Sequence, residues 1–225
     1  MISIQKSMQL LQWYYHFLYL GKFMEHVIKT TDLSPHAQDM IIPTSNNTSF
    51  TLKWSTIKTL LTQIYKQPTK KNVFGYMVEI NARRGVFSVM RELLQDKDNF
   101  QKFVQQTLQD QYFAFEQSII FIRNILSHSI DSNVTIEIAS LVWQKMYLAE
   151  RHATTLNFQF CYADYIQAWK GSKTYGITIH IDFNAIKQGQ NLTDLVPEHT
   201  LYLFAELCYN VTELFKFKTG KKKVK

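Results

Sequence analysis

Residues 100–129 read FQKFVQQTLQDQYFAFEQSIIFIRNILSHS, and this stretch decides the fold class. It is rich in apolar residues and contains neither Gly nor Pro, which is typical of packed helices. The apolar residues include Phe100, Phe103, Val104, Leu108, Phe113, Phe115, Ile119, Ile120, Ile122 and Ile125. We expect Asp96 or Asp98 to cap the helical region at its start and a break to fall near Asp110. The stretch predicts long packed helices.

Outside this stretch, five segments predict further helices by the helical spacing of their apolar residues. They are residues 4–18, 52–64, 76–94, 134–152 and a last helix that begins at Pro197, a favoured first position. The third of these contains Gly85. Residues 30–52 break the periodicity with two prolines and an Asn/Thr/Ser cluster, so we expect a long loop there.

Two short segments alternate with period two and predict half-buried strands. Leu156, Phe158 and Phe160 alternate with polar or small residues, and Ile177, Ile179 and Ile181 do the same. An antiparallel hairpin with a long connection, at about residues 155–185, is the natural interpretation. The sequence therefore predicts a mainly α fold, a helical bundle with one inserted antiparallel β-hairpin.

We expect one domain over residues 1–225, because all the helices need one another to bury their apolar faces. Residues 1–90 would supply N-terminal helices, residues 91–218 the bundle with the hairpin, and residues 219–225 a basic tail. The composition supports a folded chain, since 46% of the residues are hydrophobic and 14% aromatic.

The sequence excludes several function classes. No run of eighteen apolar residues is present, so we expect no membrane-spanning helix, and the first segment lacks a cleavable signal pattern, so we expect a cytoplasmic protein. Nucleotide-loop, zinc-protease and serine-hydrolase motifs are absent, and Cys161 and Cys208 stand far apart without metal-ligand spacing. We expect neither metal nor cofactor. An aromatic-rich first helix at a membrane surface stays open as an alternative.

A net charge of +7 favours an anionic partner, and one group of residues could act on such a partner. Arg123, Asn124 and His128 stand at the end of an otherwise apolar helix. Asn124 and His128 are four residues apart and share a face. A guanidinium donates a planar fork to phosphate oxygens, and an imidazole can take or give a proton near neutral pH. Each residue also has a structural interpretation, as a helix-end cation or cap.

The segment R-N-I-L-S-H, residues 123–128, resembles the signature of the HEPN family, in which an Arg and a polar residue precede a His. The resemblance extends over roughly residues 90–215. It implies a metal-independent endoribonuclease that works as a homodimer, with Arg123, Asn124 and His128 as the catalytic residues. It also implies a toxin or phage-defence role with an antitoxin or regulatory partner. Some family toxins carry a Tyr two residues after the His, and Ile130 departs from that pattern, which puts regulation of that type in doubt.

Weaker candidates for RNA phosphate contacts are basic residues elsewhere in the chain: Arg83, Arg84, Lys221, Lys222 and Lys223. The alternative to an enzyme is a non-catalytic module of the same fold that binds RNA or a protein. The histidine at this spacing favours the enzyme, because a binding module has no need of it.

Overall fold

The computed structural model describes residues 3–30, 38–43, 49–66, 78–128, 134–161 and 176–220. The chain forms two compact units. Unit 1 comprises Met1–Tyr15 and Arg83–Lys225, and unit 2 comprises His16–Ala82. The predicted motif lies in unit 1.

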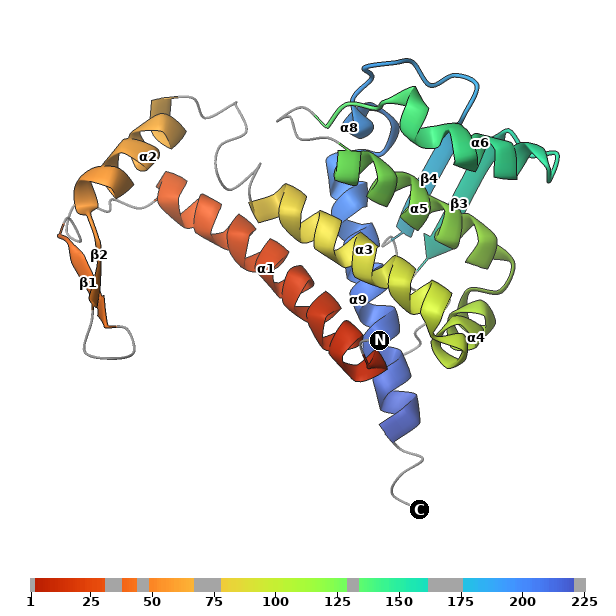
Figure 1. Ribbon diagram of the computed structural model, residues 1–225, viewed down its shortest axis with the longest axis horizontal. Coiled ribbons are helices and arrows are strands. Elements are labelled where there is room, and N and C mark those ends of the chain that lie inside the picture. The colour runs from red at the N-terminus through yellow and green to blue at the C-terminus, as the bar shows by residue number, and fades with distance from the viewer. Residues whose placement is uncertain are drawn as a thin grey trace. The chain divides into compact units, whose positions relative to one another are not determined.

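The fold is mainly α, as predicted, with small antiparallel hairpins (Figure 1). The α-helices are α1 (Ile4–Thr30), α2 (Trp54–Lys66), α3 (Ile80–Asp96), α4 (Asp98–Leu108), α5 (Tyr112–His128), α6 (Val142–Ala149), α8 (Leu192–Leu195) and α9 (Glu198–Gly220). The strands are β1 (Met40–Pro43), β2 (Ser49–Leu52), β3 (Thr155–Cys161) and β4 (Gly176–Asp182). Across the described ranges, no helix is long and apolar enough to cross a membrane.

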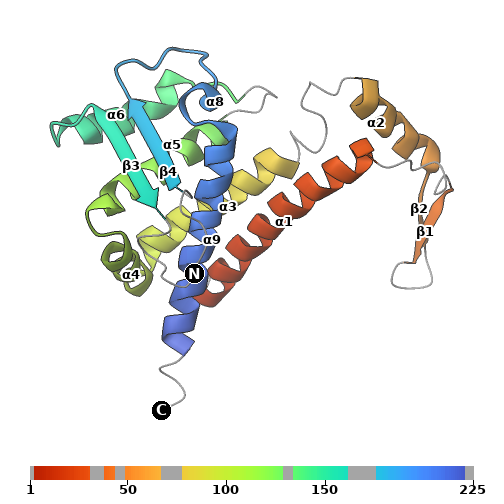
Figure 2. The ribbon, with the colours of Figure 1, turned by 180° about the vertical axis from the view of Figure 1, so that it is seen from behind.

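The hairpin predicted near residues 155–185 is confirmed. Strand β3 pairs antiparallel with β4, and Phe158 lies opposite Ile179. Alternate residues on both strands are buried, because one face of the hairpin packs against helices and the other faces solvent. Helix α5 contacts β3 and α9 contacts β4, and both helices lie beside the hairpin in Figure 2.

An aromatic cluster forms the centre of unit 1. The ring of Phe204, on α9, lies 5.4 Å from those of Phe115 on α5 and Phe158 on β3, and 5.6 Å from that of Phe87 on α3. All four side chains are fully buried. These edge-on and tilted contacts join three helices and the hairpin into one core, which gives α5 a rigid support.

The break predicted near Asp110 is confirmed, but the predicted aspartate cap is wrong. Helix α4 ends at Leu108, a short 3-10 helix spans Gln109–Gln111, and α5 follows. The cap position of α4 is occupied by Lys97. Asp98 lies inside the first turn of α4 instead. There the positive end of the helix dipole stabilises its negative charge.

The helix predicted over residues 134–152 is wrong at its start, in residues 134–136. They are extended, and Thr135 forms an isolated antiparallel bridge with Asn191. Val134 and Ile136 are buried on either side of it. Helical structure begins only with a 3-10 turn ahead of α6. The β-branched residues pack well in extended backbone and lose side-chain freedom in a helix, so tertiary pairing prevails here.

Unit 2 contains a second hairpin, which corrects the loop predicted over residues 30–52. Strands β1 and β2 pair antiparallel, with Met40 opposite Leu52. All four residues of β1 are exposed. A hairpin that buries no face leaves no alternation in the sequence, and this explains why spacing alone did not predict it. Residues 31–37 and 44–48 of that segment lie outside the described part of the chain.

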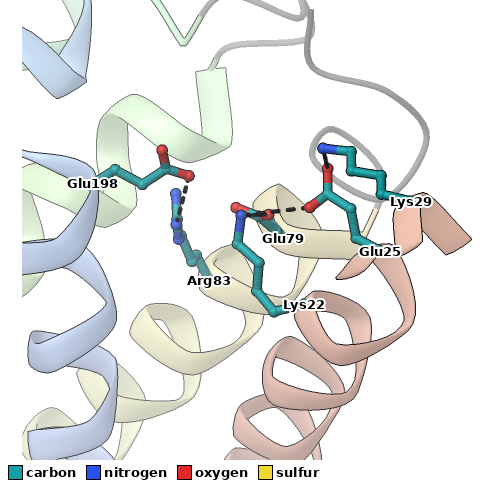
Figure 3. A network of polar contacts seen from close by, with 6 residues as sticks. All are labelled: Lys22, Glu25, Lys29, Glu79, Arg83 and Glu198. Carbon is teal, nitrogen blue, oxygen red and sulfur yellow. Dashed lines mark hydrogen bonds and ion pairs between the residues drawn. The ribbon is translucent and has the colours of Figure 1, made fainter. Parts of the chain in front are cut away.

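A buried carboxylate joins two elements of unit 2. Glu79, only 2% exposed, forms an ion pair with Lys22 of α1 (Figure 3). Lys22 also lies 3.5 Å from Glu25, and Lys29 lies 2.9 Å from the same residue. The ion pair with Lys22 compensates the buried charge of Glu79.

Candidate functional site

The predicted motif occupies the last two turns of α5. Arg123 and Asn124 are half-buried, and His128 is exposed at the end of the helix. Ile125 and Leu126, between them, are buried. A guanidinium nitrogen of Arg123, Nη1, donates to Oδ1 of Asn124 at 3.2 Å. The structure therefore joins Arg123 to Asn124 and leaves the His128 imidazole open to solvent.

The end of α5 is held by a residue that the sequence suggested for RNA contact. Nε of Arg84, on α3, donates to the carbonyl oxygen of Leu126 at 2.7 Å. That carbonyl belongs to the last turn of α5, where backbone acceptors lack helical partners. Arg84 thus stabilises the last turn of α5, which carries the motif.

Arg83 is also engaged inside unit 1. It is 3% exposed. Its Nη2 lies 3.4 Å from Oε1 of Glu198, and its guanidinium carbon lies 4.4 Å from the centre of the Tyr202 ring. Figure 3 draws the contact between Arg83 and Glu198. A guanidinium buried in this way is not presented to an RNA phosphate. Lys221, Lys222 and Lys223 lie outside the described residues.

Arg91, on α3, joins the candidate site from a distant part of the sequence. Its pKa is lowered, first by burial and second by the positive charge of Arg123. The Nε atoms of Arg91 and Arg123 are both buried without a hydrogen-bond partner. Within the described residues, neither guanidinium forms an ion pair with a carboxylate. Two neighbouring guanidiniums that no carboxylate pairs with could bind an anion.

A cavity of about 490 Å³ opens beside these arginines, among α3, α5 and α6. Its lining consists of Arg91, Gln95, Glu116, Gln117, Ile120, Asn124, Trp143, Gln144, Met146, Tyr147 and Glu150. The volume is in the range of small-molecule sites. Of the three predicted motif residues, Asn124 lines the cavity, while Arg123 adjoins it through its bond to Asn124 and His128 lies at the helix end.

Two buried glutamines form the floor between α5 and α6. Nε2 of Gln144 donates to the backbone oxygen of Gln117 at 2.8 Å and to its Oε1 at 3.2 Å. Gln144 is 4% exposed, and its own Oε1 is buried without a partner. A buried acceptor without a donor is costly, and this one belongs to a side chain that lines the cavity.

Sequence reasoning missed Arg91 and the aromatic residues of α6. Arg91 is a charged residue within the apolar run of α3, near the buried Met90 and Leu93. A charged residue among buried apolar residues is a sequence signal for a functional site. Nothing local connects Arg91 to Arg123, because the two meet only through the packing of α3 against α5. Metal chemistry has no evident ligand set, since no three His, Cys, Asp or Glu side chains of the described residues are grouped to hold an ion.

Comparison of the chain with models of protein families, with curated proteins and with solved structures finds no match. The HEPN resemblance therefore depends on the residues of the motif and on the helix that carries them.

Proposed function

We propose that the protein is a metal-independent endoribonuclease of HEPN type, which acts as a cytoplasmic homodimer. The observation that carries the proposal is the presence of a half-buried arginine, Arg123, and an exposed histidine, His128, in the last two turns of one packed helix. Arg123 is oriented by Asn124, and the backbone beside His128 is held by Arg84.

The chemistry needs no metal because RNA supplies its own nucleophile. A general base takes the proton of a 2′-hydroxyl, and the 2′-oxygen forms a bond to phosphorus. The bond from phosphorus to the 5′-oxygen breaks, and a general acid gives that oxygen a proton. The products carry a 2′,3′-cyclic phosphate and a 5′-hydroxyl. An imidazole can serve either proton transfer, and a guanidinium stabilises the charge that develops on the phosphate oxygens.

A dimer follows from the count of histidines in the motif. One chain supplies one His128, whereas the reaction uses a base and an acid. Two copies around a two-fold axis supply both. The exposure of His128 at the end of α5 leaves it accessible to a second chain. The family resemblance extends the proposal to a toxin or phage-defence protein held in check by a partner protein.

The test is incubation of the purified protein with total RNA in EDTA, followed by analysis of the product ends. We expect cleavage with cyclic-phosphate ends by the wild type and by His199→Ala, a control at an exposed histidine of α9. We expect His128→Ala to lower the rate at least a hundredfold, in line with the ~10²–10⁴ that a positioned acid or base contributes. Equal rates for His128→Ala and the wild type would refute the proposal.

The second candidate function is a non-catalytic module that binds RNA or a protein partner. The location of His128, outside the residues that line the cavity, favours it. RNA that is bound but left intact, by a wild type that sediments as a monomer, would support this second function over the first.

A further inference from the structure

The cavity among α3, α5 and α6 has two chemically different ends. Its cationic end is formed by Arg91 and Asn124, with Arg123 adjoining through its bond to Oδ1 of Asn124. Asn124 adds the Nδ2 amide as a donor, while its Oδ1 already accepts from Arg123. The two guanidiniums and the Asn124 amide offer several N–H donors at this end, and such donors suit a phosphate group.

The opposite end presents acceptors and an aromatic surface. Glu116 lies two helical turns before Asn124 on α5, roughly 12 Å away along the axis at 1.5 Å per residue. Helix α6 runs antiparallel to α5, since Gln144 bonds to Gln117 while the Tyr147 ring lies 6.3 Å from that of Phe113. Tyr147 and Glu116 therefore belong to the end of the cavity away from Asn124.

A stacking surface is available on α6. Trp143, Met146 and Tyr147 follow one another at helical spacing on the face that lines the cavity. The Trp143 side chain is 80% exposed, an unusual state for the largest apolar residue. The Tyr147 ring is held by the guanidinium of Arg151, whose carbon lies 3.8 Å from the ring centre. Trp143 is exposed and Tyr147 is half-buried beside it, and an exposed aromatic ring such as that of Trp143 can stack on a nucleobase.

Gln144 gives the cavity an unsatisfied acceptor. Its Oε1 is buried and without a partner, while its Nε2 is committed to Gln117. An acceptor fixed in this way selects a ligand with an N–H or O–H donor. The amino and imino groups of nucleobases are such donors, and the carboxylates of Glu116 and Glu150 offer further acceptors in the same cavity.

We infer that this cavity binds one nucleotide of a single-stranded RNA, with its phosphate on Arg91, Arg123 and Asn124 and its base against Trp143 and Tyr147. The inference rests on the proposed function for the identity of the polymer. Asn124 belongs to both the motif and the cavity, so the bound nucleotide is a neighbour of the phosphate to be cut. A base inside a duplex could not reach an aromatic surface, which is why the strand is single.

The experiment is isothermal titration of the full chain, in EDTA, with the four nucleoside 5′-monophosphates, the corresponding nucleosides and inorganic phosphate. We expect a saturable site for at least one monophosphate and weaker binding of its nucleoside and of phosphate alone. Arg91→Ala should weaken the monophosphate about tenfold or more, because a charge-assisted bond is lost. Trp143→Ala should have a comparable effect through stacking. Lys187→Ala, at an exposed lysine outside the cavity, is the matched control and should bind as the wild type does.

Wild-type affinity in both Arg91→Ala and Trp143→Ala, or no saturable binding by the wild type, would overturn the inference. Trp143 is exposed enough that its replacement does not threaten the fold. The RNA cleavage assay, run on the same proteins, separates this inference from the proposed function. Nucleotide binding that depends on Arg91 in a protein that cuts no RNA supports the cavity and refutes the nuclease. RNA cleavage whose KM is unchanged by Arg91→Ala supports the nuclease and refutes nucleotide binding in the cavity.

Discussion

The ring of Tyr14, on α1, lies against the backbone of Gly85, on α3, so closely that a β-carbon on Gly85 would clash with the ring atoms Cδ1 and Cγ. Both residues belong to unit 1. A glycine inside a helix ordinarily weakens it by about 1 kcal/mol relative to alanine. Here the missing side chain is what allows the two helices to approach.

Gly85→Ala should therefore destabilise the protein in spite of its better helix propensity. We expect the free energy of unfolding to fall by about 1–3 kcal/mol, the usual cost of overpacking. Denaturant unfolding measures it. Gly220→Ala, at the end of α9 with nothing within 4 Å of its added carbon, is the control and should change stability by less than about 0.5 kcal/mol. A stabilised Gly85→Ala variant would contradict the Tyr14 contact.

The two cysteines should differ sharply in reactivity. Cys208 is fully buried in α9, and burial raises the pKa of its thiol well above the usual value, so little nucleophilic thiolate forms. Cys161 is half-buried at the end of β3. Titration with a disulfide reagent should modify Cys161 in the native protein and Cys208 only after unfolding. Rapid modification of both thiols in native buffer would show that α9 opens readily.

Tyr112 should contribute to the loss of stability at alkaline pH. Burial is the main reason that its pKa is raised from 10.0 to about 12, and its hydroxyl donates to Oε1 of Glu116 at 3.0 Å. The unfolded chain loses this proton near pH 10 and the folded chain near pH 12, so the unfolded state binds fewer protons between these values. The stabilisation is complete below pH 10 and is lost as the pH rises toward 12.

Denaturant unfolding from pH 9 to pH 12 would test this. We expect the free energy of unfolding of Tyr112→Phe to fall less steeply with pH than that of the wild type. Tyr19→Phe, at a side chain that is 72% exposed, should leave the slope unchanged. Identical slopes for Tyr112→Phe and the wild type would show that this hydroxyl ionises alike in both states.

Within the proposed function, Arg123→Lys should restore little of the activity lost in Arg123→Ala. A lysine keeps the charge but not the planar fork, which here also donates to Asn124. We expect initial cleavage rates at least tenfold below the wild type for Arg123→Lys, and a smaller loss for Asn124→Ala if it only orients its neighbours. Lys187→Ala serves as the control. A fully active Arg123→Lys enzyme would mean that charge alone suffices at this position.

Sequence spacing predicted the elements that bury one face against a common core. The alternation of Phe158 and Phe160 with polar residues, and the helical spacing of α5, both record a solvent side and a core side. Spacing failed where that contrast is absent. Strand β1 is exposed on both faces, and residues 134–136 are extended because a distant segment pairs with them.

The candidate site likewise has a part that the sequence predicted and a part that it did not. The motif residues follow one another in a single helix, so their spacing was visible in the sequence. Arg91 and Trp143 reach the cavity from two other helices, and only tertiary packing brings them near Asn124. The space required beside Gly85 was hidden for the same reason, since Tyr14 approaches from another helix, far away in the sequence.

The bond from Arg84 to Leu126 bears on the entropy of the last turn of α5. A helix end without such a donor frays, and each residue that frays must be ordered again before it can make a contact, at a cost of about 1–2 kcal/mol for its backbone. Because Arg84 holds Leu126, the backbone entropy of this turn is lost when the chain folds and not when a ligand binds. Whatever molecule meets His128 then meets a backbone that is already ordered, and less of its binding free energy is lost in fixing the imidazole.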